Sequence, residues 1–297
     1  MRIDELFTAG RPVFSFEFFP PKTDAGERNL LDALRALGPQ SPDYVSVTYG
    51  AGGTTRDKTI DIVQRIKGEF GMEAMAHLTC VNATVDELRR TLDQMAGAGI
   101  ENVLALRGDP PQGESAWTKT DGGFEYSTEL VTMLAAEYGF SIGAAAFPET
   151  HIHATSADDD LRFLKAKVDA GAQFLITQMF FDNRYYFDFV ERARAIGIDV
   201  PILPGVMPIL SSSGIKRMTE LSAAKLPQAL VRELDARHGD DEAVAELGVS
   251  YATLQCSDLL AGGAPGIHFL TLNRSPATRA ILSALKVFEP WRAPATA

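Results

Sequence analysis

Eight short runs of apolar, β-branched and aromatic residues recur along the chain, separated by longer amphipathic stretches. Successive runs mostly begin about 30 residues apart, which is the length of one strand–helix unit. Eight such units in a single chain of 297 residues favour a TIM (β/α)8 barrel over an open, doubly wound sheet. The expected strands are residues 13–18, 44–49, 73–79, 102–107, 141–147, 173–178, 201–206 and 266–272.

The stretches between these runs carry helix signals. Leu88, Leu92 and Met95 form an apolar stripe at helical spacing. Thr84 and Glu87 stand just before this stripe at the spacing of a capping box. The sequence therefore predicts helices between the strands, as a TIM barrel requires.

The interval before the last expected strand is about twice the length of the others and holds two further helical patterns, at residues 226–238 and 241–260. No linker or low-complexity segment divides the chain. Residues 1–297 are therefore expected to form one catalytic domain, with extra helices before the last strand. The Pro- and Ala-rich residues 289–297 are expected to be a loose tail.

Charge and cysteine content exclude several classes of protein. The chain has 28 basic and 39 acidic residues, a net charge of −11, which disfavours binding to nucleic acid or an anionic membrane. Its two cysteines, Cys80 and Cys256, suit neither a disulfide framework nor a zinc motif. The first residues lack the apolar core of a signal peptide, and no apolar run reaches the roughly 18 residues of a membrane span. A cytoplasmic protein is expected.

The first expected strand places a carboxylate where TIM barrels hold their catalytic groups, near the carboxyl end of a strand. Glu17 stands there among phenylalanines, just before the pair Pro20 and Pro21. An apolar setting would raise the pKa of this carboxyl, as a general acid at neutral pH requires. A buried structural ion pair is the alternative.

The other strand ends carry weaker signals. The glycine-rich residues 50–53 would let a ligand approach the backbone, although they fit neither standard nucleotide motif and also suit a simple turn. His77 suits a hydrogen-bonded structural role as well as a ligand contact, and no metal site is expected. Gln178 offers both a donor and an acceptor to a heterocycle, or to the backbone. Asp160 and Lys167 would share one helix face, which is typical of a solvated surface too.

The order of these strand ends is more specific than any one of them. The segments SFEFFPPK, YVSVTYGAGG, AHLTC, ALRGDPP, PETH, KVDAGA, ITQMFFD, ILPGVMP and HFLTLNR follow one another from Ser15 to Arg274. In this order the chain resembles the methylenetetrahydrofolate reductase family, in particular its bacterial, barrel-only members.

The resemblance implies a TIM-barrel flavoprotein of one-carbon metabolism and methionine biosynthesis. FAD would be held at the barrel mouth and reduced by NADH or NADPH. Methylenetetrahydrofolate would then replace the nicotinamide cofactor and be reduced to methyltetrahydrofolate, in a ping-pong reaction. Relatives of this kind form homo-oligomers, so the same is expected here.

The resemblance also assigns roles to individual residues. Glu17 would donate the proton that opens the folate imidazolidine ring, and Asp109 would lie near the flavin pyrimidine and the pterin. Gln178 would bond the pterin, Arg274 would pair with a folate carboxylate, and Thr48 would meet nicotinamide or folate. The positions matched to FAD contacts are Thr48, Tyr49, Ala51, His77, Arg107, Gly108, Asp109, Tyr126, Ser127, Phe147, His151, Asp160 and Lys167.

Three departures from the family pattern affect ligand contacts. Gly214 stands near the place of an amide that contacts folate in many relatives, and Phe147 and Leu270 stand where tyrosine is common. Two other functions therefore stay open. One is a different flavin-dependent barrel oxidoreductase, such as one that oxidises proline, and the other is a barrel that binds folate or flavin without catalysis. The presence of Glu17 and Asp109 together favours an enzyme.

Overall fold

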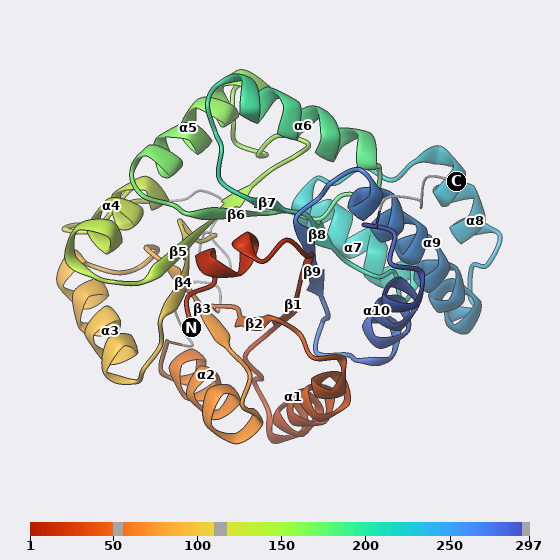
Figure 1. The fold of residues 1–297 in the computed structure, drawn as a ribbon, viewed down its shortest axis with the longest axis horizontal. Coiled ribbons are helices and arrows are strands. Elements are labelled where there is room, and N and C mark those ends of the chain that lie inside the picture. Colours follow the sequence, from red (N-terminus) through yellow and green to blue (C-terminus); the bar gives the residue numbers. More distant parts are fainter. Residues whose placement is uncertain (50–55, 110–117, 293–297) are drawn as a thin grey trace.

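The computed structural model describes residues 1–49, 56–109 and 118–292. It shows a ring of parallel strands surrounded by helices (Figure 1). The strands are β1 (Val13–Phe18), β2 (Tyr44–Val47), β3 (Ala74–Thr79), β4 (Asn102–Leu106), β5 (Ser141–Ala146), β6 (Phe174–Thr177), β7 (Ile202–Leu203), β8 (Gly205–Val206) and β9 (Gly266–Leu270). The predicted TIM barrel is confirmed, and each expected strand is found within one or two residues of its predicted start.

The barrel closes through a single segment that serves two neighbours. Residues 201–206, expected as one strand, are split at Pro204 into β7, which pairs with β6, and β8, which pairs with β9. Proline has no N–H to give to a strand ladder, but the carbonyl of Pro204 accepts a hydrogen bond from the His268 N–H at 3.0 Å. The nine strands therefore correspond to the eight strand positions of the barrel.

Ten α-helices are present in the described part of the chain: α1 (Asp24–Leu37), α2 (Arg56–Phe70), α3 (Val85–Gly97), α4 (Ser127–Glu137), α5 (Ala157–Asp169), α6 (Asn183–Ala195), α7 (Ser212–Ser222), α8 (Gln228–Asp235), α9 (Asp241–Ala261) and α10 (Pro276–Phe288). The capping box before α3 is confirmed, since Thr84 N–H donates to Glu87 Oε2 at 2.8 Å and Glu87 N–H to Thr84 Oγ1 at 3.3 Å. The two additional helices expected before the last strand are α8 and α9, and α8 begins only after Pro227.

Alternation along β1 separates two environments. Phe14, Phe16 and Phe18 belong to the large apolar core between the strands and the helices. Ser15 and Glu17 take the opposite parity and are buried on the inner side of the barrel. Because of this alternation, Glu17 lies inside the barrel and not among the phenylalanines that flank it in sequence.

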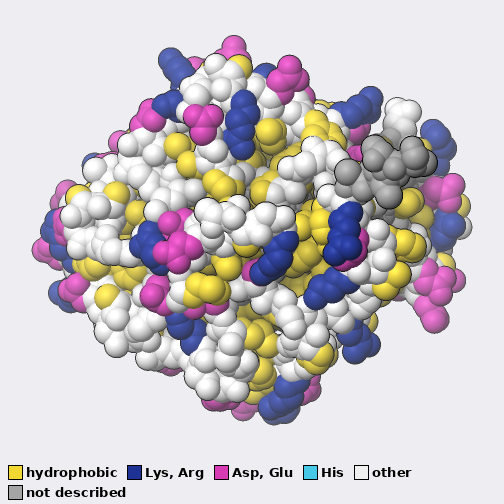
Figure 2. Space-filling model, in the orientation of Figure 1, with side chains coloured by type: hydrophobic (Ala, Val, Ile, Leu, Met, Phe, Trp, Pro, Cys, Tyr) yellow, Lys and Arg dark blue, Asp and Glu magenta, His cyan; other side chains and the backbone are white. Residues whose placement is uncertain are grey.

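The N-terminal segment closes the amino end of the barrel. The short 3-10 helix η1 (Asp4–Thr8) lies over the centre of the ring in Figure 1. Ile3 N–H donates to Asn102 Oδ1 at 2.8 Å, and Asp4 N–H donates to Ser141 Oγ at 3.1 Å. On this face, acidic and basic side chains are interspersed (Figure 2). Because the N-terminal segment covers this end, the opposite end, where the strands finish, is the mouth of the barrel.

Residues 289–292, the first part of the expected loose tail, lie in the described structure. Trp291 is half-buried and packs edge-on against Phe14, with ring centroids 5.7 Å apart. Residues 293–297 lie outside the described part of the chain. Among the helices described, none combines the length and the hydrophobicity of a transmembrane segment.

Candidate active site

Glu17 meets two imidazoles inside the barrel. Its Oε2 lies 3.3 Å from His268 Nε2 and 3.5 Å from His77 Nε2. The three residues come from β1, β9 and β3, and each of them is buried. A carboxylate and two imidazoles thus share the inner wall beneath the mouth.

The expected apolar setting of Glu17 is therefore wrong. The phenylalanines next to it in sequence point outward, because successive side chains of a strand face opposite ways. Burial raises the pKa of the Glu17 carboxyl, but the hydrogen bond with His268 and the charge that the flanking imidazoles can carry lower it by more. The pKa of Glu17 thus lies below its ordinary value, not above it.

His268 is a site residue that the sequence interpretation missed. Its Nδ1 lies 2.7 Å from Ser15 Oγ, and its ring stacks on Tyr44 with centroids 6.2 Å apart. Strand alternation was the available signal, because His268 has the inward parity of the last strand. The registers of β1 with β2 and β9 place Ser15 opposite both Tyr44 and His268.

The end of β1 is fixed by the segment that follows β9. Thr271 Oγ1 donates to the carbonyl of Glu17 at 2.6 Å. Asn273 accepts from Phe19 N–H at 2.8 Å and donates to its carbonyl at 2.9 Å. Asn273 adopts a left-handed backbone with φ of 56°, a conformation that asparagine tolerates better than most residues. These bonds hold the Glu17 backbone at the mouth.

A second group of polar side chains lies across β4, β5 and α5. Lys167 Nζ donates to the carbonyl of Ala145 at 2.9 Å, and Asp160 Oδ2 accepts from His151 N–H at 2.9 Å. Burial lowers the pKa of Lys167 to about 8, despite the opposing charge of Asp160. Burial also lowers the pKa of His151 to about 4, helped by the charge of Arg107. These residues do not form the solvated surface face that was the alternative for Asp160 and Lys167.

Gly108 occupies a position that requires glycine. Its φ is +90°, and a Cβ there would lie 2.7 Å from Val81 Cγ1 and 2.9 Å from Thr79 Cβ. This close packing turns the chain outward after Arg107 and leaves Asp109 exposed at the rim.

Gln178 follows β6 and is half-buried. Its Oε1 accepts a hydrogen bond from Met179 N–H at 2.9 Å. Among the described residues its amide nitrogen has no hydrogen-bond partner. The amide oxygen of Gln178 therefore binds the backbone, as the alternative interpretation expected. The amide nitrogen can donate to a ligand.

The remaining predicted residues lie around the rim. Tyr126, about half exposed, stacks on the equally exposed Phe163 with ring centroids 6.4 Å apart and planes 12° from parallel. Phe147 meets His151 edge-on at 4.5 Å. The others are Thr48 after β2, buried Tyr49, buried Ser127 at the start of α4, and exposed Arg274 after β9. Ala51 lies outside the described residues.

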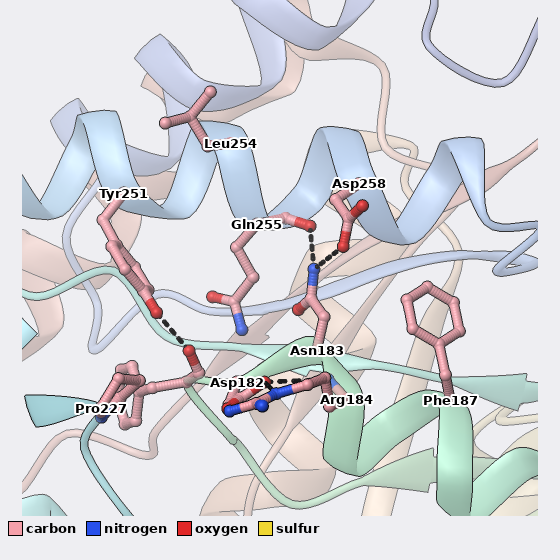
Figure 3. A pocket seen from close by; sticks show the side chains of 10 residues that line it. Asp182, Asn183, Arg184, Phe187, Pro227, Tyr251, Leu254, Gln255 and Asp258 are labelled. Carbon is pink, nitrogen blue, oxygen red and sulfur yellow. Dashed lines mark hydrogen bonds and ion pairs between the residues drawn. The ribbon is translucent and has the colours of Figure 1, made fainter. Parts of the chain in front are cut away.

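A depression of about 490 Å³ lies elsewhere, on the outer wall between α6 and α9 (Figure 3). Tyr251 donates to the carbonyl of Phe181 there, and Asn183 Nδ2 donates to Asp258 Oδ2 at 2.7 Å. None of the predicted site residues lines it. The barrel mouth is therefore the candidate active site.

A TIM barrel that carries carboxylate, imidazole and cationic side chains near the carboxyl ends of its strands has the arrangement of the enzymes with this fold. The chain belongs to the methylenetetrahydrofolate reductase family, because the family model of that description matches residues 2–286.

Two curated relatives show how the chain compares with the family. It is 40% identical over 278 residues to 5,10-methylenetetrahydrofolate reductase of Escherichia coli, covering 94% of this chain and 92% of that protein. It is 38% identical over 313 residues to methylenetetrahydrofolate reductase (NADH) 1 of Arabidopsis thaliana, covering 99% of this chain but 53% of that protein. The chain thus spans about half the length of the plant relatives it matches.

A solved structure supports the fold. A protein from Clostridium thermocellum, described as binding two copies of 5-methyl-5,6,7,8-tetrahydrofolic acid, matches with a TM-score of 0.64 and 14% sequence identity. The match covers 97% of this chain and 99% of that one. At this low sequence identity, the similarity supports the barrel fold and nothing about the function.

Proposed function

We propose that this chain reduces 5,10-methylenetetrahydrofolate to 5-methyltetrahydrofolate, with bound FAD and with NADH or NADPH as the electron donor in a ping-pong reaction. Membership of the reductase family and the identity with the Escherichia coli enzyme support the substrate. The observation that carries the chemistry is the buried Glu17 at the mouth, held between two imidazoles. We also propose that the protein is cytoplasmic and forms a homo-oligomer.

Glu17 is the proton donor in this proposal. Reduction of the one-carbon unit requires the folate imidazolidine ring to open, which is favoured when a ring nitrogen is protonated as its bond to the methylene carbon breaks. Thr271 fixes the Glu17 backbone, and 12% of the Glu17 side-chain surface is exposed. A carboxyl with these restraints can reach a substrate nitrogen without competition from bulk water.

Three residues are suited to bind folate itself. The Gln178 amide nitrogen, which has no hydrogen-bond partner among the described residues, would donate to a pterin acceptor, and Asp109 lies on the rim after β4. Its negative charge would stabilise the cation that forms as the folate ring opens. Arg274 is exposed after β9 and would pair with a folate carboxylate.

The residues of the mouth fit FAD. Two buried hydroxyl oxygens without a hydrogen-bond partner in the described structure, Ser46 Oγ and Thr79 Oγ1, line the inner wall. Lys167 and Arg107 bring positive charge for the phosphates, and Asp160 can accept from a ribose hydroxyl. FAD bound there would supply the hydride, and these side chains would orient it and exclude water.

The purified protein is expected to be yellow and to release FAD rather than FMN on denaturation, because the cationic group at α5 suits a dinucleotide. Chromatography of the released flavin identifies it, and anaerobic assays with NADH or NADPH and methylenetetrahydrofolate test turnover. A protein that reduces this folate fully without any flavin would exclude the cofactor. Turnover of proline or another amine in place of folate would instead support the other barrel oxidoreductases.

Replacement of Tyr126 by alanine is expected to weaken FAD binding several-fold and to leave FMN binding unchanged. Its ring forms an exposed stack with Phe163 at the rim, which suits the adenine half of FAD, and such stacking contributes about 1 kcal/mol. Flavin fluorescence titrations of apoprotein measure both affinities. Tyr185→Ala, at an aromatic ring that contacts Lys225 instead, is the matched control. Equal losses for FAD and FMN would place Tyr126 elsewhere in the site.

A further inference from the structure

The depression between α6 and α9 has the size and the lining of a small-molecule site, although it lies apart from the mouth. Its volume of about 490 Å³ falls within the range of roughly 300 to 1,000 Å³ that is usual for such sites. Its walls come from the start of α6, the middle of α9 and the segment just before α8 (Figure 3). The apolar part of the lining consists of Phe181, Phe187, Pro227, Tyr251 and Leu254.

Leu254 gives this depression an exposed apolar edge. The residue is 72% exposed, and it lines the same depression as the half-buried rings of Phe187 and Tyr251. A single exposed leucine needs no explanation, but apolar side chains gathered around a hollow are typical of a binding site. A flat ring placed there would cover all three side chains and remove their apolar surface from water.

Gln255 brings an unused hydrogen-bond acceptor to the depression. The residue is only 7% exposed and forms part of the lining. Its Nε2 donates to the carbonyl of Phe180 at 2.8 Å, which fixes the orientation of the amide. Among the described residues nothing donates to its Oε1. Because buried polar side chains are nearly always hydrogen-bonded, this oxygen calls for a donor from outside the chain.

Asn183 adds a second acceptor of the same kind. Its Nδ2 donates to the carbonyl of Gln255 at 3.0 Å and to Asp258 Oδ2 at 2.7 Å, so this amide is fixed as well. Its Oδ1 is buried and has no partner within the described structure. The hydroxyl of Tyr251 cannot serve it, because that hydroxyl donates to the carbonyl of Phe181. The polar wall therefore suits a ligand that carries N–H donors.

The charges of the lining favour a cation. Arg184 Nε lies 3.0 Å from Asp182 Oδ1, so these two charges offset each other. Asp258 forms an ion pair with no lysine, arginine or histidine in the described part of the chain. Its carboxylate therefore leaves the depression with an excess negative charge, which attracts a positive group and repels an anion.

We propose that the depression between α6 and α9 binds a small cationic aromatic amine. Its ring packs against Phe187, Tyr251 and Leu254, its ammonium pairs with Asp258, and its N–H groups donate to the unused acceptor oxygens of Gln255 and Asn183. This site goes beyond the proposed function, because its occupation requires neither folate nor flavin.

Tryptamine is a suitable probe, because it combines an ammonium, a flat ring and a ring N–H. Two molecules with the same ring isolate the charge, since indole-3-ethanol is neutral and indole-3-propionate is anionic. In isothermal titration calorimetry of the purified protein, we expect tryptamine to bind with a dissociation constant of about 1 mM or lower. Indole-3-ethanol should bind several-fold more weakly, and indole-3-propionate more weakly still. Absence of saturable tryptamine binding, or equal affinity for all three molecules, would contradict the proposal.

Two variants show whether tryptamine lies in the depression. Asp258→Asn removes the charge but keeps an oxygen that can accept from Asn183, so tryptamine should bind several-fold more weakly while indole-3-ethanol is unaffected. Leu254→Lys places an ammonium at the edge of the site and should weaken tryptamine binding at least about tenfold. Asp188→Asn, which removes an exposed carboxylate of α6 outside the lining, is the matched control. Unchanged tryptamine affinity in the first two variants would place the amine elsewhere and refute the site.

Sedimentation of the same proteins distinguishes a ligand site from a contact between copies of the chain. We expect the unmodified protein and Leu254→Lys to have the same molecular mass. A smaller assembly for Leu254→Lys would show that a second copy covers the depression, and the proposal would then be wrong. Flavin content and folate turnover should be unchanged in Leu254→Lys, because Leu254 lies away from the mouth. If the protein reduces no folate, the proposed function fails, while the amine titrations still decide this site.

Discussion

Glu17→Gln is expected to leave reduction of the bound flavin by NADH or NADPH intact and to slow its oxidation by methylenetetrahydrofolate by at least about a hundredfold. The amide keeps the shape of the side chain and can still hydrogen-bond to His268, but it has no carboxylic proton to donate. Stopped-flow absorbance of the flavin measures the two half-reactions separately. Equal damage to both half-reactions would show that Glu17 is a structural residue.

The same substitution at Glu149 is the matched control. Glu149 follows β5 and is half-buried, and burial raises the pKa of its carboxyl. Its two oxygens accept from the backbone N–H of Lys225 at 3.2 Å, outside the group around Glu17. Glu149→Gln should leave both half-reactions unchanged. Because both substitutions remove one negative charge, the comparison shows that the effect of Glu17→Gln depends on the position of the carboxyl group.

Gln178→Ala is expected to raise the Michaelis constant for methylenetetrahydrofolate by roughly tenfold to a hundredfold. One or two hydrogen bonds to the pterin are lost, at about 1 kcal/mol each, and a buried polar group of the ligand is left unpaired. Steady-state kinetics with the folate varied measure the effect. An unchanged folate response would show that the pterin does not lie beside β6.

Two further variants distinguish a loss of folate binding from a general change in the structure near β6. Gln255→Ala removes another buried amide that braces the segment after β6, since Gln255 Nε2 donates to the carbonyl of Phe180 at 2.8 Å. Gln255 lies on α9 and does not belong to the mouth, so the folate constant should not change. Gly214→Gln adds the amide that the family resemblance leads us to expect near this position and should alter the constant by less than about tenfold. Its new Cβ would lie 2.7 Å from Ser211 Oγ, which caps α7 and must shift slightly.

Much of the fold could be predicted because its signals are local. The alternation and spacing of apolar runs located every strand, and the capping box located the start of α3. The split at Pro204 could not be predicted from propensity alone. It arises because β6 and β9 must both find a partner in one short segment, which is a property of the closed ring.

The candidate site was predicted unevenly for the same reason. Glu17 was identified from its place near a strand end. Its surroundings were predicted to be apolar because phenylalanines flank it in sequence, but these side chains point to the other face of the strand. His268 is 251 residues from Glu17 in the chain, so their contact depends on the register between the first and last strands. Gln178 was identified as a polar group at a strand end, and Lys167 as one of two polar residues on the face of a helix. Their bonds to Met179 and Ala145 could be found only from the backbone positions.

The split strand at Pro204 also bears on how the barrel opens. Two strands of two residues each close the ring, so this seam has fewer ladder hydrogen bonds than the other strand contacts. Segments with few such bonds open locally at a smaller free-energy cost than the rest of a protein. The amide of His268 is bonded to the carbonyl of Pro204, so its hydrogen exchange would report directly on opening of the seam. Brief separation there would expose His268 from the side of the barrel, giving solvent a route to the buried imidazole that bypasses the mouth.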